Sequence, residues 1–484
     1  MIAIKRSTTV LKADSRRVIL LFNTLNIGTY ETQNRSVELI NRVMNLTEED
    51  VESSYNEVMR EFSNRHKYFK PTLSKYFEKI KHHITPDIPI SEKRKLLLGA
   101  HFAKEYSIQA AALFNPSIVP HPNQENLKEG EKRFIISLRS VGEGHISSIE
   151  FREGIISSEG EVTLDTITPF SSCSEKDIST IYNKVQLKER TANISNFDNT
   201  IFDSLSSTFT YQDYEVADEA KTFEIYDTNT QKILFDIINT NYNVKADMEA
   251  PLSERVIFPS TKEESMGMED VRFVEFTHEN GRKEYIGTYT AYDGHNIIPK
   301  LIITEDFINF QIRTMFGKAV SDKGFALFPE KINGKYVMTA RQGGEDLTIM
   351  ESDDLYIWDE YEVIMSPQYE WGLVQQGNCG SPIKTENGWL LLTHAVGPLR
   401  KYVISAILLD LDQPQKIIGK LKKPLISPNE DEREGYVPNV VYSCGALKHN
   451  DNLIIPYAMS DSASSFATAS VSEILKNMTN ENTN

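Results

Sequence analysis

The sequence predicts a mainly β protein that begins with a helical segment, and three patterns support this prediction. From about residue 34 to residue 112, apolar residues recur at helical spacing. After residue 114 the chain consists of short apolar runs separated by turn residues, which is typical of a β-sandwich, barrel or propeller. Residues 304–310 and 352–358 share a polar turn, an aspartate, an apolar residue and an aromatic residue, as a repeated hairpin would.

The helical segment contains recognisable helix starts. Residues 37–43 place apolar side chains at steps of three and four, and the run from Thr47 to Asp50 resembles a capping box. Pro71 can open a third helix, and Ser91 can cap a fourth that we expect to reach Ala112. We expect these helices to serve packing or oligomerisation rather than catalysis.

Composition excludes several classes of protein. The 484-residue chain has a formal net charge of −17, whereas a nucleic-acid binder needs a concentrated basic face. The three cysteines are far apart and form no metal-ligand pair. The apolar run Val18–Phe22 is too short for a signal-peptide core, and no stretch reaches membrane-spanning length. We therefore expect a cytoplasmic protein without nucleic-acid or membrane partners.

The expected organisation has four parts. Residues 1–30 form an N-terminal segment that can be extended, residues 31–111 a helical extension, and residues 112–470 the β domain. Residues 471–484 form a C-terminal helix and a tail that frays from Thr479 onward. Residues 174–244 follow the strand rhythm less well, which indicates an insertion.

Polar residues that could carry chemistry gather near the expected strand ends. In a propeller, distant segments of this kind share one pocket at the end of the central channel. Asp270 lies between Glu269, a like charge that raises its pKa, and Arg272, an opposite charge that lowers it. By itself, such an acidic pair with an arginine is usually structural. The clusters comprise residues 114–117 with 138–145, residues 267–272, residues 289–294, residues 327–331 with Arg341, and residues 377–383 with Gly388, Trp389 and His394.

Other kinds of catalytic site find little support. The sequence has no Walker-type glycine loop and no Gly-x-Ser-x-Gly nucleophile motif. The ten histidines show no zinc-type spacing. We expect neither a metal nor a cofactor.

In their order along the chain, these segments resemble glycoside hydrolase family 130, which contains β-mannoside hydrolases and phosphorylases. Residues 268–272 are similar to the family's Glu-Asp-Pro-Arg signature, with Val271 in place of proline. The resemblance extends from about Ala112 to the C-terminus and leaves out the N-terminal helices. The other similar blocks are residues 289–294, 327–336, 380–383, 388–390, 393–396 and 435–441.

The resemblance implies a five-bladed β-propeller that forms the catalytic domain and cleaves β-mannosides with inversion. It gives Asp270 the role of proton donor, and it implies that Asn115, Arg139 and Asp461 hold the mannosyl unit. Arg341 and His394 resemble two members of the basic pocket in which the family's phosphorylases bind phosphate. We also expect substrate contacts from Ser117, Glu269, Arg272 and Tyr292.

Departures from the family pattern lead us to expect hydrolysis ahead of phosphorolysis. The run Ser321–Gly324 stands where the family has Arg-Asn-Lys-Asp, Gln375 where it has lysine, and Ala340 where it has histidine. An inverting hydrolase needs a carboxylate that activates water. Asp322 is the first candidate for this base. The others are Glu330, Glu432 and Glu434.

The predicted function is therefore inverting hydrolysis of β-mannosidic linkages, including β-1,2 linkages, in oligosaccharides. The first alternative is a β-mannoside phosphorylase that releases mannose 1-phosphate, with inorganic phosphate as its co-substrate. The second alternative is a propeller that binds sugar without catalysis. In each case the expected partner is an oligosaccharide, and the N-terminal helices could support a homo-oligomer.

Overall fold

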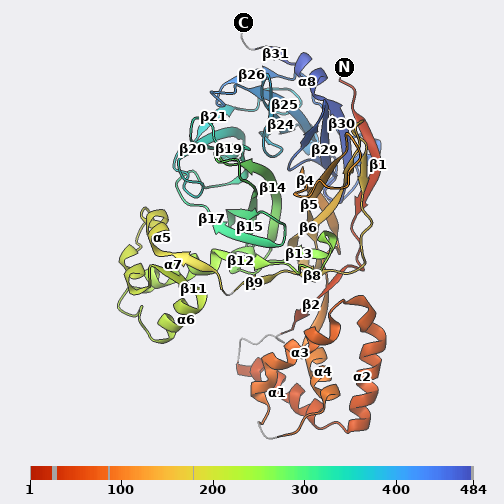
Figure 1. The fold of residues 1–484 in the computed structure, drawn as a ribbon, viewed down its shortest axis with the longest axis vertical. Helices are drawn as coiled ribbons and strands as arrows, with labels where there is room; N and C mark the ends of the chain where they lie inside the picture. The colour runs from red at the N-terminus through yellow and green to blue at the C-terminus, as the bar shows by residue number, and fades with distance from the viewer. Residues whose placement is uncertain (1, 24–29, 86–87, 178, 481–484) are drawn as a thin grey trace.

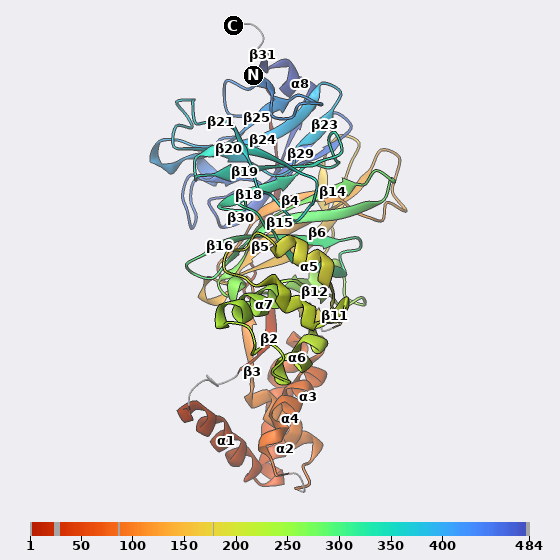
Figure 2. The ribbon, with the colours of Figure 1, turned by 90° about the vertical axis from the view of Figure 1, so that its left-hand side faces the viewer.

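The computed structural model describes residues 2–23, 30–85, 88–177 and 179–480 of the protein. It confirms a mainly β fold preceded by helices. Figures 1 and 2 show a helical lobe at one end, a larger β body at the other, and a second group of helices on the side of the β body. None of the described helices is both long and apolar enough to cross a membrane.

Four amphipathic helices form the N-terminal lobe. Thr47 caps the second helix by accepting a hydrogen bond from the Asp50 N–H, and Ser91 caps the fourth by accepting one from the Arg94 N–H. The buried Arg94 side chain donates to the carbonyls of Val43 and Leu46, which ties the fourth helix to the end of the first. The helices are α1 (Tyr30–Met44), α2 (Glu48–Phe62), α3 (Phe69–Ile80) and α4 (Glu92–His101).

The fourth helix ends earlier than the sequence pattern predicts. α4 stops at His101, and the chain continues as strand β3 (Ala103–Ser107), which pairs antiparallel with β2 (Val18–Phe22). Phe102 is fully buried at this junction. The prediction that the helix reaches Ala112 was wrong because pairing with β2 outweighs the local helical pattern. The two strands connect the helical lobe to the β body.

The β body contains five consecutive groups of antiparallel strands. The first two groups share one large sheet, joined through a parallel pair between Ser147 and Gly267. The first group is β4 (Ala112–Pro120), β5 (Lys132–Val141), β6 (Ser147–Ile156) and β7 (Val162–Leu164), with β8 (Ser172–Cys173) and β13 (Arg255–Ile257) beside it. The second is β14 (Gly267–Thr277), β15 (Lys283–Tyr292), β16 (Ile297–Thr304) and β17 (Asn309–Thr314), with β12 (Tyr242–Lys245) and β9 (Glu175–Asp177).

The remaining three groups complete the body. The third is β18 (Lys323–Leu327), β19 (Tyr336–Gln342), β20 (Asp346–Ser352) and β21 (Glu362–Met365). The fourth is β22 (Gln375–Asn378), β23 (Ile383–Thr385), β24 (Gly388–Val396), β25 (Tyr402–Leu409), β26 (Ile417–Lys420) and β31 (Thr479–Asn480). The fifth is β27 (Val441–Tyr442), β28 (Leu447–His449), β29 (Asn452–Met459) and β30 (Ala463–Ser470).

The two ends of the chain meet in the last group. Strand β1 (Lys5–Lys12) pairs antiparallel with β30, so an N-terminal strand completes a sheet built from C-terminal residues (Figure 1). Helix α8 (Val471–Lys476) follows β30, and Ser470 caps it. Thr479 and Asn480 belong to β31, which pairs with β26. Residues 481–484, the rest of the tail that we expected to fray, lie outside the described residues, as do residues 1 and 24–29 of the N-terminal segment.

The segment that departs from the strand rhythm contains three helices with a core of their own. Phe202, Phe209, Tyr214, Leu234 and Ile238 are buried together in this core. The helices project from the side of the β body (Figure 1). They are α5 (Lys184–Thr191), α6 (Tyr211–Glu219) and α7 (Thr228–Thr240).

The repeated turn pattern has a physical basis. Asp306 accepts hydrogen bonds from the N–H groups of Ile308 and Asn309, and Asp354 accepts one from the N–H of Tyr356. In each turn the aspartate satisfies backbone donors while the residue after it, Phe307 or Leu355, is buried. The same turn therefore ends the third strand of both the second and the third group.

Candidate active site

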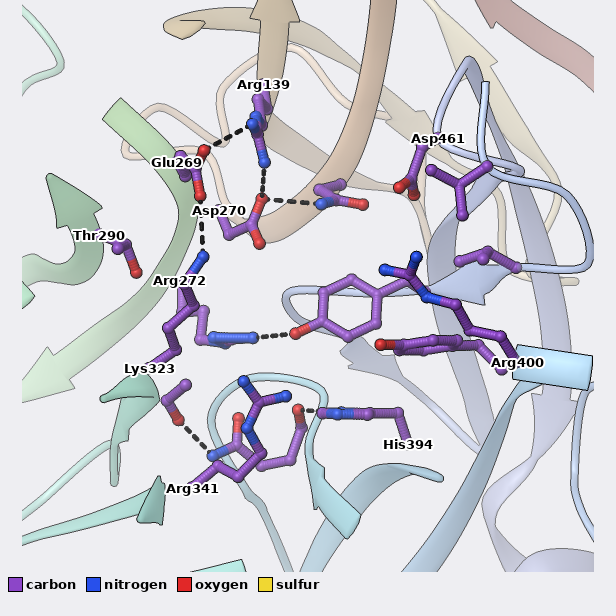
Figure 3. A pocket seen from close by; sticks show the side chains of 17 residues that line it. Arg139, Glu269, Asp270, Arg272, Thr290, Lys323, Arg341, His394, Arg400 and Asp461 are labelled. Carbon is purple, nitrogen blue, oxygen red and sulfur yellow. Dashed lines mark hydrogen bonds and ion pairs between the residues drawn. The ribbon is translucent and has the colours of Figure 1, made fainter. Parts of the chain in front are cut away.

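A cavity of about 330 Å³ lies where the five groups of strands meet (Figure 3). Each group contributes to it, from its first strand: β4 supplies Asn115, β14 Asp270, β18 Lys323, β22 Asn378 and β27 Tyr442. The remaining lining residues are Arg139, Glu269, Arg272, Thr290, Gly324, Arg341, His394, Arg400, Tyr402, Val437, Val440 and Asp461.

Irregular strands direct several of these side chains. The pairing of β4 with β5 shifts register between Phe114 and Ser117, and the pairing of β14 with β15 shifts between Glu269 and Arg272. Asn115 and Asp270 lie in these irregularities with φ of 49° and 56°. Such bulges re-aim side chains, and Asn and Asp tolerate positive φ better than most residues. Two strands thus deliver polar groups to the cavity at positions that would otherwise continue the sheet.

Asp270 is held by a donor on each of two neighbouring strands. Its Oδ1 accepts a hydrogen bond of 2.7 Å from Asn115 Nδ2 and one of 3.3 Å from Arg139 Nη1. Glu269 binds the same arginine at 2.7 Å and Lys323 Nζ at 3.1 Å. The Oδ1 atom of Asn115 is buried and has no partner among the described residues, so it is available to a ligand hydroxyl.

The two aspartates of the cavity have opposite pKa shifts. Burial disfavours the charged form of Asp270, but Arg139, the hydrogen bond from Asn115 and the charge of Arg272 together hold its pKa below the ordinary value. Burial and the nearby charge of Asp270 raise the pKa of Asp461 to about 6, although Arg139 and Arg400 oppose this shift. At neutral pH without substrate, Asp270 is therefore ionised, and Asp461 is the carboxyl that gains a proton on mild acidification.

The raised pKa of Asp461 predicts a pH-dependent stability. The folded protein binds the proton on Asp461 more tightly than the unfolded chain does. Protonated Asp461 therefore adds to the free energy of unfolding, fully below pH 3.8, and this contribution is lost as the pH rises through about 6. We expect the free energy of unfolding of the wild type to fall by on the order of 3 kcal/mol between pH 4 and pH 7 through this group, and Asp461→Asn should abolish that fall. Urea unfolding of both proteins at several pH values measures the difference. Parallel stability curves for the two proteins would contradict the assignment.

The opposite side of the cavity is basic. Arg272 donates to the hydroxyl of Tyr442, and Arg341 Nη2 lies 3.9 Å from Asp322 Oδ1. The Nε atoms of Arg272 and Arg341 are buried without a partner among the described residues. Figure 3 shows Arg341 and His394 across the cavity from Arg139, Glu269 and Asp270. An anion in this part of the cavity would meet two guanidinium groups.

His394 is neutral in this setting. Its Nδ1 lies 2.9 Å from the carbonyl oxygen of Asn378, which can only accept, so Nδ1 carries the hydrogen. Its Nε2 lies 3.2 Å from the amide nitrogen of Gln375, which donates to it. Burial, together with the charge of Arg341, lowers the pKa of His394 to about 3. The ring therefore brings no positive charge to the cavity.

The structure brings together eight of the eleven site residues expected from the sequence: Asn115, Arg139, Glu269, Asp270, Arg272, Arg341, His394 and Asp461. Three do not line the cavity. Ser117 is buried and accepts from the Phe273 N–H, Tyr292 donates to the Gly294 carbonyl, and Asp322 lies 3.9 Å from Arg341 without lining the cavity.

The other carboxylates considered as a base also lie elsewhere. Glu330 pairs with Lys384, and Glu432 is buried against Arg6 and Tyr457. Glu434 is exposed. None of the three lines the cavity.

Sequence reasoning missed several lining residues. Lys323 stands within the run from Ser321 to Gly324 that we interpreted as a loss of basic character, although the lysine itself enters the cavity. Arg400 and Tyr402 follow His394 on the β24–β25 hairpin, and Tyr442 follows the block 435–441. Their position just beyond a matching block is the signal that could have identified them.

Comparison with known proteins identifies the family. Residues 220–480, more than half of the chain, match the family model Glyco_hydro_130, which is described as beta-1,4-mannooligosaccharide phosphorylase. The chain belongs to glycoside hydrolase family 130. This confirms the resemblance seen in the sequence and makes the protein a member of an enzyme family.

Curated relatives of this family 130 chain include two bacterial enzymes. The "1,2-beta-oligomannan phosphorylase" of Thermoanaerobacter sp. (strain X514) is 34% identical over 232 residues, which are 46% of this chain and 75% of the relative. The "Beta-1,2-mannobiose phosphorylase" of Listeria innocua serovar 6a is 32% identical over 229 residues, which are 45% of this chain and 62% of the relative.

A solved structure gives a looser match. The structure titled "Beta-1,2-Mannobiose phosphorylase from Listeria innocua - beta-1,2-mannobiose complex" aligns with a TM-score of 0.47 and 21% identity, over 77% of this chain and 92% of that one. At this level the likeness supports no argument about function.

The relatives correct the expected reaction. The curated relatives of this family 130 chain are named as phosphorylases of β-mannosides, which overturns the expectation that hydrolysis comes first. The sequence argument counted cations lost at Ser321 and Gln375. It gave no weight to two cations that line the same cavity, Arg272 on β14 and Lys323 within the run 321–324 itself. Asp322 was expected to activate water for hydrolysis, so this role is withdrawn together with the hydrolysis hypothesis.

Proposed function

We propose that the protein is a β-mannoside phosphorylase that acts on β-1,2-linked mannosides. An oxygen of inorganic phosphate attacks the anomeric carbon of the terminal mannosyl unit, and the glycosidic C–O bond breaks. The leaving oxygen takes up a proton. The products are α-mannose 1-phosphate and a saccharide shortened by one unit. The names of the relatives carry this proposal, and three of them specify β-1,2-linked or 1,2-β substrates.

The charges of the cavity support a phosphate site on its basic side. A phosphate dianion taken out of water needs charge-assisted hydrogen bonds. Arg272 and Arg341 each have a buried Nε without a partner among the described residues, and Lys323 lines the same cavity. Since His394 is neutral, we assign the charge pairing to Arg341 and Arg272, with Lys323 as a further cation.

We assign the proton donor to Asp270. Its carboxyl shares the cavity with the free acceptor Asn115 Oδ1 and with Arg139, which suit the hydroxyls of a mannosyl unit. A proton donor must be protonated when it acts, whereas Arg139 holds Asp270 ionised in the free protein. A bound sugar that excludes water adds to the burial, which is the largest influence on this pKa, and so favours protonation.

We infer that the five groups of strands are the blades of a five-bladed propeller. Three features support this inference. The main strands of the groups, from β4–β7 to β27–β30, follow one another along the chain, a strand of each reaches one shared cavity, and β1 pairs with β30 as a closing strand would. This architecture explains how residues from 115 to 461 contribute to one site.

The products formed with and without phosphate test the proposed function. The purified protein is incubated with β-1,2-mannobiose and with β-1,4-linked mannosides across a range of phosphate concentrations. We expect mannose 1-phosphate to form at a rate that saturates with phosphate, fastest with the β-1,2-linked substrate. Free mannose as the sole product, at a rate independent of phosphate, would overturn the proposal, as would binding without turnover.

A further inference from the structure

An exposed aromatic side chain, Tyr436, stands next in sequence to a residue that lines the cavity. Tyr436 is 70% exposed, although its neighbour Val437 lines the cavity. The ring of His145 lies against it, with the two centroids 5.7 Å apart and the planes inclined by 33°. The Tyr436 ring thus has one aromatic neighbour, while most of its surface remains open to solvent.

Backbone contacts fix Tyr436 in this place. The Val437 N–H donates to the Ser460 carbonyl at 3.1 Å, next to Asp461. At Gly435 a side chain is excluded, because a Cβ atom would lie 2.5 Å from the Ser460 carbonyl oxygen. Gly435 thereby lets the segment pack directly against the turn that carries Asp461. The position of Tyr436 is built into the fold.

An unpaired cation lines the same cavity. Arg400 lines the cavity, is exposed, and forms no hydrogen bond or ion pair with any described residue. In Figure 3 its guanidinium extends into the cavity on the side of Asp461, and its charge lowers the pKa of that aspartate. The Tyr402 N–H donates to the Asn439 carbonyl, which links the hairpin of Arg400 to the segment of Tyr436.

The loop that presents Arg400 adopts an unusual backbone. Leu399 and Arg400 have φ of 56° and 54°, two adjacent non-glycine residues in the left-handed region. Each such residue is strained by about 1 kcal/mol or more. The Leu399 side chain is 91% exposed, so burial of this side chain does not offset the strain. Backbone strain of this kind concentrates at ligand-binding sites.

We propose that Tyr436 and Arg400 form the leaving-group subsite, where the sugar released by phosphorolysis is bound. A sugar ring has an apolar face of C–H groups and a rim of hydroxyls. The C–H face can pack on the ring of Tyr436, and the hydroxyls can accept hydrogen bonds from the guanidinium of Arg400. The charged groups around Asp270 and Arg341 hold the mannosyl unit and phosphate, and Tyr436 and Arg400 hold the second sugar. This inference rests on the proposed phosphorylase function and adds its acceptor specificity.

The synthetic direction of the reaction separates the two subsites. The enzyme receives α-mannose 1-phosphate as donor and mannose or β-1,2-mannobiose as acceptor. Tyr436→Ala should raise the KM for the acceptor about three- to tenfold and leave the KM for the donor unchanged. Tyr436→Phe should behave like the wild type because stacking does not need the hydroxyl. Arg400→Ala should also raise the acceptor KM, and Arg400→Lys should restore part of the loss.

Two exposed residues, one adjacent to Arg400 and one away from the cavity, provide matched controls. Lys401→Ala removes the adjacent cation, and Tyr361→Ala removes an exposed tyrosine away from the cavity. Both should match the wild type. An unchanged acceptor KM in Tyr436→Ala and Arg400→Ala would overturn the inference. A donor KM that rises in place of the acceptor KM would also overturn it, because it would place Arg400 at the phosphate.

Binding tests the subsite even if the proposed function fails. If the wild type forms no disaccharide from mannose 1-phosphate, phosphorolysis is wrong, and the affinity for β-1,2-mannobiose is then measured by calorimetry. Weaker binding in Tyr436→Ala, with normal binding in Tyr436→Phe and Lys401→Ala, would retain the subsite. Equal affinity in all four proteins would reject it.

Discussion

Asp270→Asn is expected to lower kcat for phosphorolysis of β-1,2-mannobiose by about 10²- to 10⁴-fold, the usual contribution of a general acid. The amide keeps the shape of the carboxyl but has no proton to transfer to the leaving oxygen. A substrate with an activated leaving group, such as an aryl β-mannoside, should lose much less activity, because its departure needs little protonation. Initial rates with both substrates measure the two effects.

The structure makes asparagine the appropriate replacement. Position 270 has a φ of 56°, which asparagine tolerates, and its Oδ1 can still accept from Asn115 and Arg139. We therefore expect the variant to fold normally and to keep its affinity for the disaccharide within a few fold. Asp353→Asn, at an exposed carboxylate outside the cavity, is the matched control. Near-normal kcat in Asp270→Asn would remove Asp270 from the mechanism.

Arg341→Met should raise the KM for phosphate by about 10- to 100-fold, because hydrogen bonds to a charged partner contribute roughly 1.5–3 kcal/mol. Methionine keeps much of the length of the side chain and removes only its charge and donors. The KM for mannobiose should change little, since Arg341 lies across the cavity from Asp270 and Arg139 (Figure 3). Rates measured while each substrate is varied in turn separate the two constants.

Asp322→Asn should not weaken phosphate binding, in contrast to Arg341→Met. Asp322 lies beside Arg341 outside the cavity lining, so its replacement removes the one carboxylate that the described residues place within 4 Å of the guanidinium. We expect activity to persist and the KM for phosphate to stay level or fall. Loss of activity in Asp322→Asn together with an unchanged phosphate KM in Arg341→Met would refute the assignment of the basic side to phosphate.

Much of the site could be predicted from the sequence because its residues belong to recognisable blocks. Asp270, Arg139 and His394 were identified from local motifs, and the structure places all three in one cavity. The mainly β class followed from the rhythm of short apolar runs. Local patterns also identified the starts of α2 and α4, since the caps at Thr47 and Ser91 are formed by neighbouring residues.

What the sequence could not show depends on distant contacts. The end of α4 is set by pairing between β2 and β3, whose partners lie about 85 residues apart. The side chain of Ser117 faces the backbone of β14, whereas Asn115, two residues earlier, reaches the cavity through a bulge. The charge of the cavity is a sum over several strands, so the substitutions at Ser321 and Gln375 gave a misleading account of it. A role of the N-terminal helices in oligomerisation stays a prediction.

The origin of the oxygen on the released mannosyl unit tests the phosphorylase proposal most directly. The reaction with β-1,2-mannobiose and phosphate is run in water enriched in ¹⁸O, and the products are analysed by mass spectrometry and by ³¹P NMR. Phosphorolysis predicts α-mannose 1-phosphate without solvent ¹⁸O at the anomeric position, and free mannose that gains ¹⁸O only at the slow rate at which its hemiacetal exchanges with water. Mannose that carries one ¹⁸O atom from water, with no phosphate ester formed, would contradict the proposal and show that water is the nucleophile.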